Sequence, residues 1–89
     1  MAVTSGTLAV GTAVISIPVT CYMPWRLEIK NNDNTDAVFI GDENVTTANG
    51  MRLSKEERLE LTLAPLDRVY VVSTKAGHSI SWMRFTQAC

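Results

Sequence analysis

Apolar and polar side chains alternate along two segments of the chain, which is the pattern of a β-strand with one buried face and one wet face. The stretch WRLEIKNN (25–32) has Trp25, Leu27 and Ile29 as its apolar members. The stretch RLELTLAP (58–65) repeats the pattern with leucines, and its proline is expected to end the strand. Both segments are therefore predicted to be strands.

Further short runs contain many β-branched and aromatic residues or lack charge, and they are also expected to be strands. They are GTLAVG (6–11), TAVISIPVT (12–20), DAVFIG (36–41), RVYVVS (68–73) and ISWMRF (80–85). DAVFIG and RVYVVS are expected to be buried on both faces, and STKAGHS (73–79) to form a hairpin connection.

The only helical candidate is SKEERLEL (54–61), in which Ser54 and Glu57 have capping-box spacing. The alternation that begins at Leu59 favours a strand, so at most one turn is expected there. About six to seven short strands with almost no helix predict an all-β chain, a small antiparallel β-sandwich or barrel. We expect one domain, with an uncharged, strand-forming N-terminal arm (1–20) and a β-sandwich body (21–89).

Charge is distributed unevenly along the 89 residues, which include 8 Lys and Arg and 9 Asp and Glu. Every one of these lies from Arg26 onward. The near-neutral balance gives no basic face for nucleic acid. The uncharged front is interrupted by Thr, Ser and Gly, so neither a secretory signal nor a membrane span is predicted, and the chain is expected to stay in the cytoplasm where it is made.

The uncharged arm presents strand edges without charges that would deter pairing, so it is expected to be covered. Two arrangements remain open: the arm completes its own sandwich, or it adds a strand to a neighbouring subunit.

Candidate chemistry is sparse. The carboxylates of the polar loops can be solvated turn residues or a cation site without calcium-loop spacing; they are Asp33, Asp36, Asp42 and Glu43. The only histidine, His78, is expected in a surface turn. Cys21 and Cys89 are expected to be a packed thiol and a tail thiol, with a bridge as the alternative. No nucleophile, phosphate or metal motif is present, so we expect no catalytic residue, no cofactor, no metal and no enzyme.

At least two of the four strand aromatics are expected in the core; they are Trp25, Tyr70, Trp82 and Phe85. The bulky residues Tyr22, Met23 and Trp25, which surround Pro24, suit either the core or a contact surface.

The stretch AVFIGDENVTTANG (37–50) runs from a strand into a polar loop. Gly41 would let the chain leave the strand, Asn49-Gly50 would accept positive φ, and the threonines would bond to the local backbone. A structured loop is predicted, with Gly41, Val45, Thr46, Thr47, Asn49 and Gly50 as its defining residues.

The succession of LEIKNN, VFIGDENVTTANGMRL, ERLELTL, DRVYVVSTKAG and ISWMRF resembles small virion proteins of tailed bacteriophages. Those chains share an I-x-N strand end, a V-x-I-G strand, a V-T-x-x-N-G loop, an L-x-x-x-E segment, a D-x-x-Y strand and a last strand after A-G. The resemblance covers residues 21–85 and implies a β-sandwich used as a capsid decoration, head-fibre or tail-associated module.

The resemblance leads to the hypothesis of a non-enzymatic capsid decoration or cement protein, located in the virion and assembled in the host cytoplasm. Its expected partners are the major capsid protein and further copies of itself. The contact residues expected are Val3, Thr4, Leu8 and Val10 in the arm, with Tyr22 and Trp25 at the bend. The alternatives are a glycan- or receptor-binding module of a head fibre or tail, with exposed Tyr70 or Trp82 beside the polar loop, and a head-tail connector or tail subunit.

Overall fold

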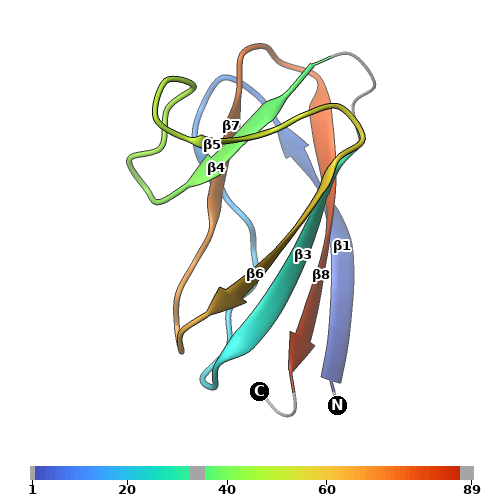
Figure 1. Ribbon diagram of the computed structural model, residues 1–89, viewed down its shortest axis with the longest axis vertical. Coiled ribbons are helices and arrows are strands. Elements are labelled where there is room, and N and C mark those ends of the chain that lie inside the picture. Colours follow the sequence, from blue (N-terminus) through green and yellow to red (C-terminus); the bar gives the residue numbers. More distant parts are fainter. Residues whose placement is uncertain (1, 33–35, 87–89) are drawn as a thin grey trace.

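The computed structural model describes residues 2–32 and 36–86, which form eight strands and no helix (Figure 1). The strands are β1 (Ala2–Val10), β2 (Ile15–Ser16), β3 (Trp25–Asn31), β4 (Val38–Gly41), β5 (Met51–Leu53), β6 (Arg58–Leu63), β7 (Tyr70–Ser73) and β8 (His78–Thr86). The predicted all-β class is confirmed. No helix that is long and apolar enough to cross a membrane occurs in the described part of the chain.

The strands form two antiparallel sheets of four, consistent with a small β-sandwich. Sheet A has the order β1-β8-β3-β6 (Figure 1). Sheet B has the order β2-β7-β4-β5. The predicted hairpin at residues 73–79 is wrong, because β7 pairs with β2 and β4 whereas β8 pairs with β1 and β3. The connection therefore crosses from one sheet to the other, and Gly77 supplies a φ of 89° on the way.

The core lies between the inner faces of the two sheets. Trp25, Leu27 and Ile29 on β3 are 2%, 0% and 0% exposed, as their alternation predicts. Trp82 on β8 is also buried, so the expectation of at least two core aromatics is confirmed. Inward side chains of the other strands complete this core; they include Val10, Val38, Ile40, Leu53, Val71 and Ile80.

The uncharged front of the chain supplies β1, which lies in the chain's own sheet A. It pairs with β8 from Ala2 opposite Thr86 to Val10 opposite His78. The second predicted front strand is reduced to β2, after which Ile17 and Val19 turn into the core.

The helical candidate at Ser54 is a single turn, as expected. The Ser54 N–H donates to Glu57 Oε1 at 2.7 Å, and the Glu57 N–H donates to the Ser54 carbonyl at 3.1 Å. Glu56 has a φ of 56°, so the chain reverses at this turn and enters β6 without forming a helix.

Candidate functional site

Three large apolar side chains are exposed at the end of the sandwich where β3 begins and β6 ends. Tyr22 is 77% exposed, Met23 53% and Leu66 61%. Two different turns carry them, and the Leu66 N–H joins these turns by donating to the Cys21 carbonyl at 2.7 Å. We call Tyr22, Met23 and Leu66 the apolar tip.

The turn that carries Leu66 is fixed by its own hydrogen bonds. The Asp67 N–H donates to the Ala64 carbonyl at 3.2 Å, and the Ala64 N–H donates to Asp67 Oδ2 at 3.2 Å. Thr20 Oγ1 also donates to the Asp67 carbonyl, at 3.0 Å, from the neighbouring segment. Leu66 follows Pro65 with a φ of 66°, the position that glycine or asparagine normally fills in a type II turn. Hydrogen bonds therefore hold the turn of Leu66, and this residue has a strained backbone.

The structure separates the contact residues expected from the sequence. Val10 and Trp25 are each 2% exposed and belong to the core. Leu8 is half-buried against the same core, whereas Val3 is 57% exposed on β1. Together with Tyr22, Val3 is thus available for contact with a partner.

Thr4, another expected contact residue, helps to hold β1 in place. Arg84 Nη2 donates to Thr4 Oγ1 at 2.9 Å, and Arg84 Nη1 donates to the Thr20 carbonyl at 2.8 Å. One guanidinium from β8 therefore ties the first strand to the segment that leads into the tip.

The polar loop between β4 and β5 is held by local hydrogen bonds, as the sequence predicted. The Asn44 N–H donates to Asp42 Oδ1 at 2.9 Å, and the Thr46 N–H donates to Asn49 Oδ1 at 2.7 Å. In return, the Asn49 N–H donates to Thr46 Oγ1 at 3.2 Å, and the Gly50 N–H donates to the Thr46 carbonyl at 2.9 Å. These bonds give the loop one defined shape.

The glycines of this loop provide space for Val45, which is 3% exposed and lies outside the core cluster between the sheets. A Cβ at Gly41 would lie 2.8 Å from Val45 Cγ2, and one at Gly50 would lie 2.7 Å from it and 2.8 Å from Phe39 Cβ. Neither Gly50 nor Asn49 has a positive φ, so the loop does not use the tolerance of these residues for that backbone. The loop folds back over the outer face of sheet B, where close approach requires glycine.

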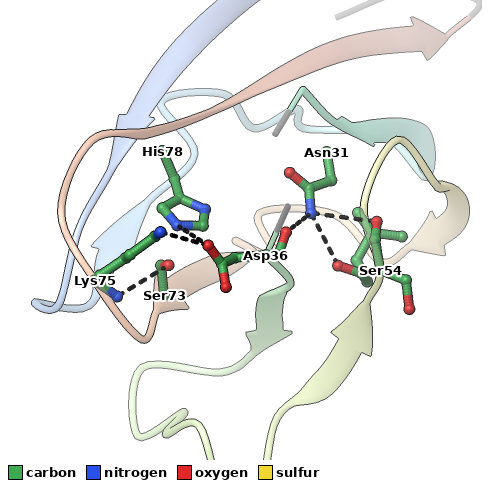
Figure 2. A network of polar contacts seen from close by, with 7 residues as sticks. Asn31, Asp36, Ser54, Ser73, Lys75 and His78 are labelled. Atoms are coloured by element: carbon green, nitrogen blue, oxygen red, sulfur yellow. Dashed lines mark hydrogen bonds and ion pairs between the residues drawn. The ribbon is translucent and has the colours of Figure 1, made fainter. Parts of the chain in front are cut away.

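A polar network joins the two sheets at the end opposite the tip, where β3 ends (Figure 2). Asn31 is 0% exposed, and its Nδ2 donates to the carbonyls of Asp36, Leu53 and Ser54 at 2.9, 3.1 and 3.2 Å. Asp36 precedes β4, Leu53 ends β5 and Ser54 follows it, so one side chain of sheet A binds the backbone at the ends of two strands of sheet B. The network is therefore structural.

His78 belongs to the same region and is 3% exposed, so its expected place in a surface turn is wrong. It begins β8, and its Nε2 lies 4.0 Å from Asp36 Oδ2, which also pairs with Lys75 Nζ at 2.6 Å (Figure 2). The alternation of buried residues on β8, from Trp82 through Ile80, extends back to His78 and would have located it.

The carboxylates considered for a cation have other partners or lie apart. Asp36 is paired with Lys75, Asp42 accepts the bond inside its own loop, and Asp33 lies outside the described residues. In residues 2–32 and 36–86, no three His, Cys, Asp or Glu side chains are grouped to hold a metal. Cys21 is buried in the core, and Cys89 also lies outside the described residues.

The aromatic side chains expected near the polar loop do not form a sugar platform. Trp82 is 7% exposed and lies in sheet A, while Tyr70 is half-buried opposite Gly41. A groove of about 410 Å³ does run along the loop, but threonines, valines and a serine line it, including Thr47 and Thr74. This groove offers no aromatic ring for stacking on a sugar.

Leu66 is the residue of the tip that was not expected from the sequence. The step from Pro65 into Asp67 resembles an ordinary proline turn, and only the left-handed backbone makes its leucine unusual.

In comparisons with known proteins, no protein-family model matches the chain and no curated protein matches it.

Proposed function

We propose that this chain is a non-enzymatic virion structural protein of a tailed bacteriophage, which decorates the capsid by binding across neighbouring major-capsid subunits. The observation that carries the proposal is the apolar tip. Its three exposed side chains come from two turns that are hydrogen-bonded to each other. The resemblance of residues 21–85 to small phage virion proteins is the reason to propose that the chain is part of a virion.

The backbone of Leu66 supports a contact role for the tip. A left-handed backbone is unfavourable for a residue other than glycine by about 1–2 kcal/mol. Leu66 is 61% exposed, so its side chain does not regain this free energy by entering the core. Residues with a strained backbone are concentrated at functional sites. A leucine held outward in this way suits insertion into an apolar pocket of a partner.

A tip whose two turns are joined by a hydrogen bond is also suited to a shell with many identical sites. Because its turns are already ordered, binding loses little conformational entropy. Tyrosine and methionine are enriched in protein interfaces, and a few anchors in a pocket can supply most of the binding free energy. A modest contact is then multiplied over many copies on one particle.

The first test is the copy number of this chain per purified virus particle, measured by quantitative mass spectrometry against the major capsid protein. Hundreds of copies are expected for a shell decoration. About a dozen copies or fewer would replace the proposal with a connector, tail or fibre role, and absence from particles would refute it.

The second test measures binding of variants to particles that lack this protein. Met23→Ser removes an apolar side chain from the tip, and Met51→Ser removes one of similar exposure from β5, at 53% and 59% respectively. We expect Met23→Ser to weaken binding at least tenfold and Met51→Ser to bind as the wild type does. Equal binding by the two variants would exclude the tip as the contact.

A further inference from the structure

The two sheets have four edge strands, and three of them are protected against pairing with another chain. In sheet B, β2 and β5 are only two and three residues long. In sheet A, β6 carries the exposed charged residues Arg58 and Glu60. Short length and charge are the usual means by which proteins protect a sheet edge.

The fourth edge strand, β1, has neither protection. It is nine residues long, carries no charged side chain, and has β8 as its single hydrogen-bonded neighbour among the described strands. In an antiparallel pair, alternate residues direct both backbone groups away from the partner. About half of the β1 residues therefore present an N–H and a C=O at the free edge.

We propose that β1 pairs antiparallel with β1 of a second copy of this chain. The result is one continuous sheet that runs from β6 of one copy to β6 of the other. The twofold axis passes through Gly6, because this register alone pairs every residue from Ala2 to Val10.

This register matches the two faces of the sheet. Residues opposite each other are both even-numbered or both odd-numbered, so inner positions meet inner positions and outer positions meet outer ones. Ser5 lies opposite Thr7 of the second copy, and both are exposed hydroxyl residues of the outer face. Val3, which is 57% exposed, lies opposite the exposed Ala9 of the second copy. In this register, each β1 residue whose N–H and C=O point away from β8 lies opposite a residue of the second copy whose N–H and C=O also point outward.

Several features favour a second copy as the occupant. The sequence of β1, AVTSGTLAV, begins and ends with Ala-Val and has its glycine at the centre. At most positions, side chains of similar size and polarity are therefore met from either end of the strand. Each chain has a net charge of −1, and none of its charged residues lies on β1, so self-pairing brings no charges together at the edge. A different partner would normally be selected by charges on the edge strand, and β1 carries none.

The edge is also preformed. Nine register pairs hold β1 to β8, and Arg84 donates to Thr4 Oγ1 at 2.9 Å. At the centre, a Cβ on Gly6 would lie 2.9 Å from Trp82 Cζ2, so the indole supports the strand from the inside. A strand held in this way loses little entropy when another is added, which favours addition over exchange of β1 between copies.

The inference does not depend on a role in the virion. If the chain does decorate a capsid, the dimer presents two apolar tips related by the twofold axis. Such a pair of tips would let one dimer contact two shell subunits.

The test is the molar mass of the full chain in solution, by sedimentation equilibrium from about 1 μM to 1 mM. The wild type is expected to pass from 9.8 kDa to twice that mass as concentration rises. The variant Ser5→Lys/Thr7→Lys places lysines directly opposite lysines at the twofold axis and is expected to raise the dissociation constant at least 100-fold. The control Thr62→Lys/Thr74→Lys adds the same charge at exposed positions of β6 and the β7–β8 connection, and it should dimerise as the wild type does.

Amide hydrogen exchange of the wild type tests the same interface without a mutation. At high concentration, outward N–H groups of β1 should become protected, whereas those of β6 should not change. The inference is overturned if the wild type remains at 9.8 kDa up to 1 mM, if the β1 lysine variant dimerises as the wild type does, or if protection appears in β6 and not in β1.

Discussion

Replacing Gly50 by alanine should destabilise the protein through the crowding around Val45. The added Cβ would lie 2.7 Å from Val45 Cγ2, 2.8 Å from Phe39 Cβ and 3.0 Å from the Thr46 carbonyl oxygen. Because two of these atoms sit near or on the backbone, the loop cannot yield by rotating one side chain. Overpacking of this kind lowers the free energy of unfolding by about 1–3 kcal/mol.

Gly11→Ala is the matched control, because the nearest atom to its added Cβ is Ala76 Cα at 3.9 Å. Gly11 has no positive φ, so alanine should leave the native state unstrained and reduce the entropy of the unfolded chain. The expected change is a stabilisation of about 0.4–1 kcal/mol.

Urea unfolding followed by tryptophan fluorescence measures both variants, since Trp25 and Trp82 are buried in the native state. In thermal unfolding, a domain of this size should lose roughly 4–8 °C per kcal/mol. If Gly50→Ala is as stable as the wild type, or if Gly11→Ala is destabilised equally, the close packing of the loop over sheet B is wrong.

Two further substitutions test other features of the fold. Asn31→Asp should lower the free energy of unfolding by about 3 kcal/mol or more, because a carboxylate would face three carbonyl oxygens that now accept from Nδ2. The control Asn32→Asp, at an exposed residue, should change the free energy of unfolding by less than about 1 kcal/mol. Similar urea midpoints for the two variants would contradict the role of Asn31. Leu66→Asn should raise the free energy of unfolding by about 0.5–1 kcal/mol, because asparagine tolerates the left-handed backbone. If this variant unfolds at a lower temperature than the wild type does, Leu66 is not strained.

Strands with a regular alternation were predictable from the sequence. The pattern of Trp25, Leu27 and Ile29 gave both the extent of β3 and its buried face, because side chains alternate across a sheet with a period of two. The loop after β4 was also predictable in outline, since Asp42, Thr46 and Asn49 bond to nearby backbone groups in a local way.

Features that depend on the assignment of strands to sheets were not predictable. The segment between Ser73 and His78 has the composition of a hairpin turn, but it changes sheets because β7 and β8 pair with strands distant in the sequence. Burial of His78 follows from that crossing. At Gly50 the sequence suggested tolerance of a positive φ, but the deciding factor is the space beside Val45, which depends on the three-dimensional path of the loop.

The pairing of β1 with β8 joins the first described strand to the last, with Ala2 opposite Thr86. During synthesis, β1 leaves the ribosome long before β8, so both of its uncharged edges stay open until nearly the whole domain has emerged. Non-local pairing of this kind slows folding and prolongs exposure of strands that aggregate. The yield of folded protein should therefore depend on chaperones that shield the nascent β1, more than on the stability of the finished sandwich.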